Sequence, residues 1–216
     1  MKGWIKMKVF VAGATGRVGQ AVVKLLLAQG DQVLAGGRNL AQLPAEVTPV
    51  ALDLHASVAE LQVKLADSQA VIFTGGSRGR DLLQTDLNGA VKLMMAAQAA
   101  GIKRFIHLSS AYALDQTMWA KVPALAQLTD YNIAKFFSDR WLMDETTLAY
   151  TIIQAGILTP TPATGKVSLN PATSGENSIE DVAAVLVASL AEPKTIRQVI
   201  MMKAGTTPIA EALAQL

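Results

Sequence analysis

A tyrosine and a lysine stand four residues apart in the second half of the chain, at Tyr131 and Lys135. On a helix, this spacing places both side chains on the same face. A lysine ammonium beside a phenol stabilises the phenolate and would lower the pKa of the tyrosine toward working pH. The pair could therefore exchange a proton with a carbonyl or a hydroxyl group. The same spacing also arises often by chance on amphipathic helices.

Two adjacent serines, Ser109 and Ser110, end an apolar run that starts at Arg104. A hydroxyl at the carboxyl end of a strand could hydrogen-bond the oxygen that the tyrosine protonates. Neighbouring residues of a strand point to opposite faces, so only one of the two serines can face a substrate. We expect this residue to be Ser110, with Ser109 as the alternative.

Three glycines, Gly13, Gly16 and Gly19, lie between an apolar run at 9–12 and a helical pattern at 20–29. This order of strand, turn and helix is typical of dinucleotide binding. The first glycine permits the tight turn, the second admits a pyrophosphate, and the third lets the helix pack against the strand. The helix N-terminus adds oriented N–H groups and a partial positive charge. The expected cofactor contacts in this loop are Gly13, Thr15, Gly16, Arg17 and Val18.

The end of the second predicted strand indicates which dinucleotide binds. An NAD site usually places Asp or Glu there to hold the ribose 2′-hydroxyl. Residues 33–38 read Val-Leu-Ala-Gly-Gly-Arg and contain no carboxylate. The guanidinium of Arg38 can pair with a 2′-phosphate, and Arg17 could add to that pocket. We therefore expect NADP(H), with NAD(H) as the alternative; Arg38 could also be an ordinary exposed loop cation.

The elements that must position these residues follow an alternating pattern. Short apolar runs alternate with longer helical patterns, which indicates βαβ units and a parallel sheet. The predicted strands lie at 8–12, 32–36, 47–51, 70–73, 104–108 and 149–154, and the predicted helices at 16–29, 57–65, 82–100 and 131–146. In the helix at 82–100, Leu83, Leu87 and Met94 recur at the helical period. The predicted fold class is α/β, a Rossmann-type doubly wound parallel sheet.

The last third of the chain is less regular, with several prolines and glycines after residue 154. It contains a short strand at 166–169, a helix at 179–191 and a strand at 198–202, followed by a small helix. This region is too small for an independent domain. We expect 155–216 to form a small C-terminal cap on the substrate side, so that residues 1–216 make one NAD(P)-binding domain.

The composition bounds the possible partners. Of the 216 residues, 51% are hydrophobic and 17% charged, which indicates a well-buried globular protein. The net charge is only +2 and no stretch concentrates Lys or Arg, so we expect a small-molecule substrate and neither a nucleic acid nor a membrane as partner. We expect a monomer or a homodimer. The two histidines, His55 and His107, have no cluster of carboxylates beside them, so no metal site is expected.

The absence of cysteine excludes disulfides and thiolate chemistry and fits a reducing cytoplasm, the expected location. No apolar run reaches the roughly 18–20 residues that a membrane span needs. The start of the chain lacks the apolar region and the cleavage site of a signal peptide. We expect residues 1–6 to be a loose extension before an alternative start at Met7.

The chain resembles the atypical short-chain dehydrogenases/reductases, in particular the small bacterial NAD(P)H-binding oxidoreductases, and more distantly biliverdin reductase B, a flavin reductase. The similarity covers nearly the whole chain. It rests on the glycine loop 13–19 and on the segments 52–54, 86–90, 104–110, 131–135 and 179–183. These motifs are specific to the superfamily and not to one reaction.

The resemblance implies roles for individual residues. The catalytic group would be Ser110, Tyr131 and Lys135, with Lys135 also holding the cofactor ribose. Further cofactor contacts would be Asp53 and Leu54 against the adenine, and Thr74 and Gly75 beside the pyrophosphate and ribose. For 76–79 a simple glycine turn is the preferred interpretation, and Asp86 is expected to be a structural hydrogen-bonding residue.

One segment departs from the family pattern. Relatives commonly have Arg-Pro-Gly after the sixth strand, whereas this chain has Gln154, Ala155 and Gly156. The change casts doubt on the substrate class more than on cofactor binding. The expected function is an NADP(H)-dependent oxidoreductase that reduces a small carbonyl, quinone or flavin substrate. The alternative is a non-catalytic NADP(H)-sensing regulatory protein of the same fold.

Overall fold

The computed structural model describes residues 6–216, and the expectation about the first residues of the chain lies mostly outside this range. Nine strands form one sheet in the order β11-β8-β10-β6-β5-β4-β1-β2-β3. Their bounds are β1 (Lys8–Ala12), β2 (Gln32–Gly37), β3 (Thr48–Ala51), β4 (Ala70–Phe73), β5 (Arg104–Ser110), β6 (Ala149–Ala155), β8 (Lys166–Leu169), β10 (Gln198–Ala204) and β11 (Thr207–Pro208). Strands β1 to β6 and β10 run parallel, and β8 and β11 complete the far edge in antiparallel pairing.

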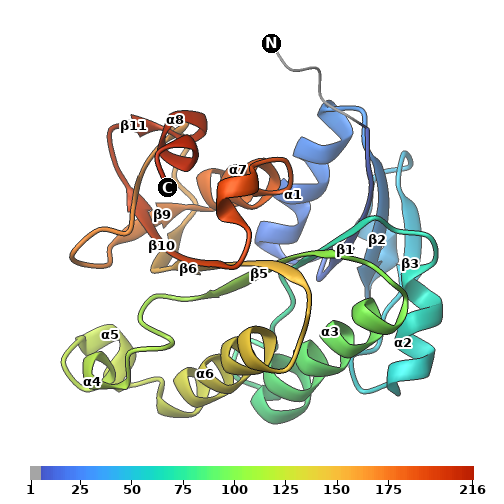
Figure 1. The fold of residues 1–216 in the computed structure, drawn as a ribbon, viewed down its shortest axis with the longest axis horizontal. Coiled ribbons are helices and arrows are strands. Elements are labelled where there is room, and N and C mark those ends of the chain that lie inside the picture. The colour runs from blue at the N-terminus through green and yellow to red at the C-terminus, as the bar shows by residue number, and fades with distance from the viewer. Residues whose placement is uncertain (1–5) are drawn as a thin grey trace.

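Helices cover both faces of this sheet (Figure 1). On one face lie α1 (Arg17–Ala28), α7 (Ile179–Ser189) and the short α8 (Ile209–Ala214); on the other lie α2 (Val58–Leu65), α3 (Ala90–Ala99) and α6 (Thr129–Asp144). Local sequence sets several helix starts. At α2, for example, Ser57 and Glu60 form a reciprocal capping box. The α/β doubly wound fold predicted from the sequence is confirmed.

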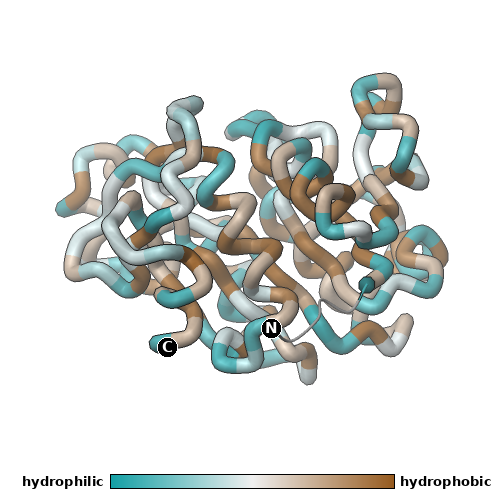
Figure 2. The backbone as a smooth tube through the Cα atoms, turned by 90° about the horizontal axis from the view of Figure 1, so that it is seen from above, coloured by the Kyte–Doolittle hydropathy of each residue, from teal (hydrophilic) through white to brown (hydrophobic). Residues whose placement is uncertain are grey.

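Two apolar cores fill the space between the sheet and its helices. Along β1, Val9 and Val11 face α1 and α7, whereas Phe10 faces the layer of α2, α3 and α6. This alternation follows from the two-residue period of a strand. The central strands are therefore apolar on both faces, and Figure 2 shows the hydrophobic segments running through the middle of the molecule.

The strand order reverses between β1 and β4. From β1 the chain proceeds outward through β2 and β3, then returns to the other side of β1 and proceeds through β4, β5 and β6. Adjacent loops diverge at such a point, and open α/β sheets bind ligands there, beyond the carboxyl ends of the strands. We therefore expect a ligand site among the segments that follow β1, β2, β3 and β4.

The last third of the chain completes the sheet. Strand β10 pairs with β6, and the side chains of Ile200 and Met202 are fully buried in the core that α1 and α7 cover. Strands β7 (Ile157–Thr159) and β9 (Glu176–Ser178) form a separate two-stranded parallel sheet. The substrate-side cap expected at 155–216 stays a prediction.

The predicted helix at 82–100 divides into two parts. Its first half, η2 (Leu82–Gly89), is π-helical, and α3 continues from it. A π-helix bonds each residue to the fifth one along, so the 3.6-residue period fails there. The expectation that Leu83 belongs to the buried stripe is wrong, because its side chain is 67% exposed. Asp86 is buried and its Oδ2 accepts a hydrogen bond from the Ser77 amide at 2.9 Å, which confirms its structural role.

Two single-turn helices that the sequence did not predict, α4 (Gln116–Trp119) and α5 (Pro123–Ala126), lie between β5 and α6. Trp119 donates from Nε1 to the Tyr112 carbonyl at 3.0 Å, and its ring meets that of Phe136 edge-on. The Tyr112 hydroxyl accepts from the amide of Ser174, on the loop between β8 and β9. Within residues 6–216, no helix is both long and apolar enough to cross a membrane.

Candidate functional site

The glycine loop connects β1 to α1 in a turn that larger residues could not form. Gly13 has a φ of +83°, and a Cβ added there would lie 2.7 Å from the Gly75 amide nitrogen. A Cβ on Gly19 would lie 2.1 Å from the Gly13 carbonyl oxygen. The amides of Gly13 and Ala14 both donate to the Gly36 carbonyl at 3.0 Å. These contacts hold the loop against the ends of β2 and β4.

The N-terminus of α1 opens at this loop and is suited to an anion. The residue before the helix is Gly16, so no side chain caps the first amides, and the first turn contains no acidic residue. Uncapped amides at a helix start need an acceptor, and the helix dipole favours a negative one. A dinucleotide pyrophosphate would satisfy both requirements.

A cavity of about 470 Å³ lies beside the loop. Among its lining residues are eight that the sequence analysis had assigned to the cofactor: Gly13, Thr15, Gly16, Arg38, Asp53, Leu54, Thr74 and Gly75. The remaining lining residues are Gly37, Leu52, His55, Gly76, Ser77, Arg78, Arg80, Asp81 and Thr85. The loops after β1, β2, β3 and β4 therefore converge on one space, and its size and glycine-rich wall fit the nucleotide part of a dinucleotide.

Three of the predicted cofactor contacts are not among the lining residues: Lys135, described below, and Arg17 and Val18. Arg17 is exposed. The Val18 side chain is buried in the core under α1, so only its backbone amide is placed to meet a cofactor phosphate. All three residues stay predictions as cofactor contacts.

Two further arginines, not expected from the sequence, line the cavity with Arg38. Arg78 and Arg80 follow β4 in the sequence Gly-Gly-Ser-Arg-Gly-Arg of residues 75–80, and a simple glycine turn is the interpretation of 76–79 from the sequence. The alternation of glycine and arginine directly after a buried strand was the available signal. With three guanidinium groups around it, the cavity favours a ligand with several negative charges.

A polar contact joins two of the loops around the cavity. His55, which follows β3, lies 2.6 Å from the Asp81 carboxylate at the start of η2. Asp81 also accepts from the Thr85 hydroxyl at 2.5 Å. These hydrogen bonds lower the pKa of Asp81 below its usual value, and the bond from Thr85 has a larger effect than the bond from His55. No local sequence pattern indicates this contact, because the two partners are 26 positions apart.

The second half of the candidate site lies at the neighbouring strand β5. Tyr131 and Lys135 belong to the first turns of α6, and the Lys135 ammonium lies 5.9 Å from the centre of the Tyr131 ring. Lys135 is only 3% exposed and donates to the Leu108 carbonyl at 3.0 Å. The expected shared face of the helix is confirmed.

The two serines at the end of β5 have different surroundings. The Ser109 hydroxyl donates to Asp139 of α6 at 2.6 Å, in a buried contact. Ser110, the last residue of β5, pairs with Ala155 of β6. Because Ser109 is already bonded to Asp139, Ser110 remains the preferred candidate for a substrate contact, and its role stays a prediction.

Gly156, in the segment that departs from the family pattern, is required by a close approach of two backbones. A Cβ on Gly156 would lie 2.2 Å from the Gly175 carbonyl oxygen, and the next amide, of Ile157, donates to that same oxygen. Gln154 is buried and its Nε2 has no hydrogen-bond partner within residues 6–216. The close approach therefore requires glycine at position 156, and a neutral amide stands at position 154, where the family resemblance leads us to expect an arginine.

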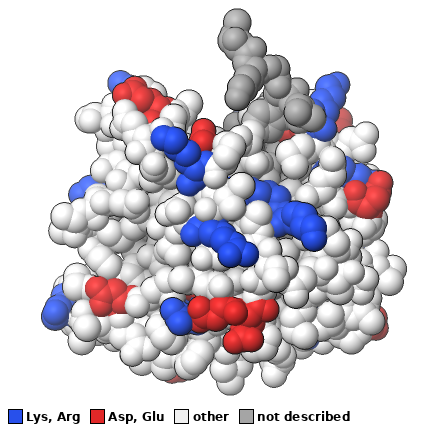
Figure 3. Space-filling model, viewed as in Figure 1, with Lys and Arg blue, Asp and Glu red and all other residues white. Residues whose placement is uncertain are grey.

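Charged groups are distributed in small clusters over the face shown in Figure 3. Basic clusters lie near the centre of this face, and an acidic cluster lies below them, with uncharged surface between. The arginines of the cavity thus differ from the surface charges in lying together around a concave space.

Comparison with known proteins gives consistent matches over the chain. Residues 13–193 match the NAD(P)H-binding protein family. A Bacillus subtilis protein described as an uncharacterised sugar epimerase, YhfK, is 37% identical over 220 residues, covering 97% of this chain and 100% of that protein. The crystal structure of the oxidoreductase ylbE from Lactococcus lactis is 42% identical and covers 97% of this chain and 96% of that one, with a TM-score of 0.94.

A more distant structure shares the fold. It is a short-chain dehydrogenase/reductase from Veillonella parvula in complex with NADP, which is 19% identical and covers 94% of this chain and 97% of that one, with a TM-score of 0.73.

Proposed function

Because this chain belongs to the NAD(P)H-binding family and has the fold of the atypical short-chain dehydrogenases/reductases, we propose that it is an NADP(H)-dependent oxidoreductase that reduces a small carbonyl, quinone or flavin compound. The observation that carries the proposal is the buried Lys135 ammonium beneath Tyr131, one strand away from an arginine-lined nucleotide cavity. Such a lysine can serve both the cofactor and a proton-donating phenol.

The cavity residues would hold the nucleotide. The uncapped amides of α1 would bind the pyrophosphate, and Asp53 and Leu54 would lie against the adenine. Arg38, with Arg78 and Arg80, would pair with the 2′-phosphate that distinguishes NADP from NAD. The NADP bound by the Veillonella parvula structure is consistent with this preference.

The residues at β5 and α6 would act on the substrate. The bound cofactor supplies a hydride. Tyr131 donates a proton to the oxygen of the substrate, Lys135 stabilises the resulting phenolate, and Ser110 hydrogen-bonds that oxygen. Lys135 would also hold the ribose of the cofactor.

A non-catalytic NADP(H) sensor is the competing function. Gln154 supports it, since a neutral amide stands where the family resemblance leads us to expect an arginine. The Ser110, Tyr131 and Lys135 set favours the enzyme, because a sensor has no need of a proton donor.

The test is NADPH oxidation by the purified protein with a panel of quinones, flavins and aldehydes. We expect oxidation with at least one compound. Gly16→Val serves as the control, because its side chain would enter the space of the pyrophosphate and abolish NADPH binding in a folded protein. Tight NADPH binding without oxidation of any compound would favour the sensor. No binding of NADPH or NADH would refute both functions.

A further inference from the structure

A buried polar cluster lies behind the candidate catalytic residues, on the side of the sheet that α6 covers. It consists of His107, Ser109, Lys135 and Asp139, all of them buried. The odd-numbered residues of β5 face α6, as Phe105 shows by its place in the core on that side. No step of the proposed reaction involves His107, Ser109 or Asp139.

Asp139 is the centre of the cluster. Its side chain is 0% exposed, and its Oδ2 accepts the bond from Ser109. Its Oδ1 lies 3.3 Å from His107 Nε2 but has no hydrogen-bond partner within residues 6–216. Asp139 cannot touch a substrate from this position. A carboxylate removed from water in this way is costly unless a positive charge offsets it.

His107 is not the source of that positive charge. Its ring is fully buried and stacks on Phe73 with 5.3 Å between the ring centres. Burial lowers the pKa of His107, and the positive charge of Lys135 lowers it further, so the imidazole is neutral at pH 7 despite the contact with Asp139. From β6, the neighbouring side chain on this face is Gln154, which is uncharged.

Lys135 provides the positive charge. It lies one helical turn before Asp139 on α6, so both side chains point toward β5. The two do not form a contact pair: Lys135 donates to the Leu108 carbonyl, and Asp139 accepts from the next residue, Ser109. Two adjacent residues of β5, Leu108 and Ser109, thus hold the buried Lys135 ammonium and the buried Asp139 carboxylate close to each other.

We propose that Asp139 is a positioning residue that acts through Lys135. Its buried negative charge, fixed by the hydrogen bond from Ser109, offsets the positive charge of the Lys135 ammonium and so holds the ammonium beside the Tyr131 ring. The effect of Asp139 on cofactor binding rests on the proposed function. The energetic coupling between the charges of Asp139 and Lys135 does not. Loss of Asp139 leaves the Lys135 ammonium without a compensating charge, so we expect the ammonium to shift toward water and away from its place beside the Tyr131 ring, where it would hold the ribose.

The test is a double-mutant cycle read by urea unfolding, with Asp139→Asn, Lys135→Met and the double variant. Each single variant leaves one uncompensated buried charge, so its urea midpoint should fall markedly. The double variant removes both charges and should unfold at a higher urea concentration than either single variant. If Lys135→Met does not fold, the expected result is that adding Asp139→Asn restores folded protein. A merely structural Asp139 would give additive losses, and that result would overturn the proposal.

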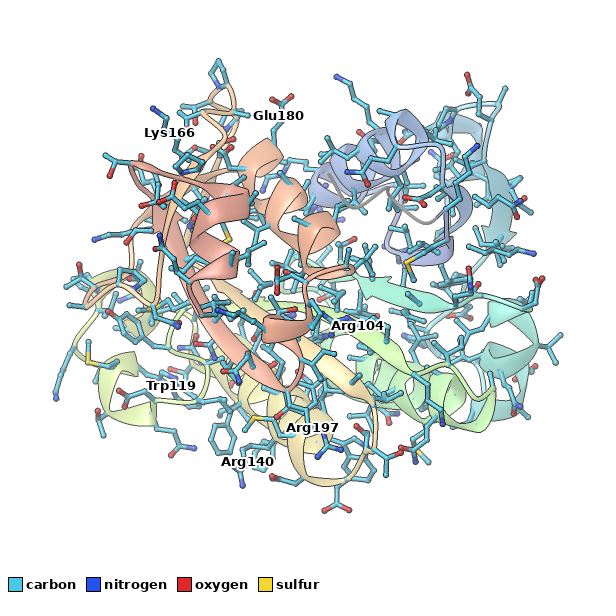
Figure 4. The ribbon with its side chains drawn as sticks, turned by 45° about the horizontal axis from the view of Figure 1, so that its top comes forward. Arg104, Trp119, Arg140, Lys166, Glu180 and Arg197 are labelled. Atoms are coloured by element: carbon cyan, nitrogen blue, oxygen red, sulfur yellow. The ribbon has the colours of Figure 1, made fainter. Side chains whose placement is uncertain are left out.

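The same helix offers a matched control. Arg140 and Asp144 have the same spacing and the same order of charges as Lys135 and Asp139, but they form a surface ion pair at 2.8 Å with about half of each side chain exposed. Figure 4 shows Arg140 at the edge of the molecule. The cycle of Arg140→Met and Asp144→Asn should show little coupling, because exposed pairs contribute little. Equal coupling in both cycles would refute a special role of burial.

NADPH affinity separates this inference from the proposed function. We expect Asp139→Asn to weaken NADPH binding about tenfold and Asp144→Asn to leave it unchanged. In the Lys135→Met background, Asp139→Asn should have no further effect on affinity. Coupled stability without any NADPH binding would refute the proposed function alone. NADPH binding with additive stability losses would refute the role of Asp139 alone.

Discussion

Arg38 differs from the other two arginines of the cavity in how its backbone is held. It follows directly on Gly37, which pairs with Ala51 of β3, so the sheet fixes its starting point. Arg78 lies in a loop, with a φ of +57°. A guanidinium presented from a rigid strand loses less freedom when it binds a phosphate than one presented from a loop. Arg38 is therefore the residue on which a preference for NADP should depend most.

Replacing Arg38 by Ala should weaken NADPH binding about tenfold or more, since one charged hydrogen-bonding partner contributes roughly 1.5–3 kcal/mol. NADH, which lacks the 2′-phosphate, should bind almost as before. Calorimetric titration of both nucleotides into both proteins measures the effect, with Arg78→Ala expected to cause a smaller loss. Equal affinities of the unmodified protein for NADPH and NADH would contradict the assignment.

Tyr131→Phe removes a hydroxyl and leaves the ring over which Lys135 lies. Turnover of a carbonyl substrate should fall by about 10²–10⁴, the usual contribution of a positioned general acid, with NADPH affinity almost intact. Steady-state kinetics and a separate binding titration distinguish the two quantities. A flavin or quinone can take its proton from water, so full activity with such a substrate would refute only the tyrosine as acid.

At the scale of the elements, one buried arginine joins four segments at the end of the sheet opposite the site. Arg104 begins β5, and its guanidinium donates to the Ala149 carbonyl, the Ser189 carbonyl and the hydroxyls of Thr151 and Thr195 at 2.5–2.7 Å. Burial lowers its pKa to about 10, still well above neutrality. Figure 4 shows Arg104 inside the molecule, among β6, α7 and the segment that leads to β10.

Arg104→Met should destabilise the protein by about 3 kcal/mol or more, because hydrogen bonds from a charged donor contribute roughly 1.5–3 kcal/mol each. Urea unfolding gives the change. Arg104→Lys keeps the charge but not the planar fork, so an intermediate loss is expected. NADPH affinity of either folded variant should be unchanged, and a selective loss of affinity would show that this end of the sheet communicates with the cavity.

The elements that the sequence predicted well are those with a strong local pattern. The six strands from β1 to β6 and the glycine loop follow from apolar runs and from one strand–turn–helix motif. The π-helical η2 was not predictable, since its irregular hydrogen bonds are set by packing against α6 and by the buried Asp86. The place of Arg80 in the cavity wall depends on the path of a loop, which no periodic pattern predicts. The contact of Ser109 with Asp139 joins residues 30 positions apart, so no local pattern predicts it either.

The whole molecule should lose stability in mild acid because of one buried imidazole. The folded pKa of His107 lies below the unfolded value of about 6.5, so below that pH the unfolded chain binds a proton that the folded protein does not. The contribution of His107 to the free energy of unfolding is therefore fully present above about pH 6.5. Below that pH the free energy of unfolding falls by up to about 1.4 kcal/mol per pH unit. The lowered carboxylate pKa values of Glu60 and Asp81 act only in stronger acid.

Chemical unfolding between pH 7.5 and about pH 5 measures this loss. His107→Gln has no group that titrates in this range at that position, so its stability should fall less over the same interval. Parallel pH dependence in the two proteins would show that His107 takes up its proton while folded.

The two outer strands of the nine-stranded sheet share a feature that bears on how copies of this protein behave when crowded together. An outer strand offers free amides to which another chain can add, and this is how many sheet proteins form insoluble aggregates. Here β3 contains Pro49 and β11 ends in Pro208, so each outer strand lacks one donor. Both outer strands are also very short, at four and two residues. The molecule therefore resists growing by edge-to-edge addition, whatever ligand it holds.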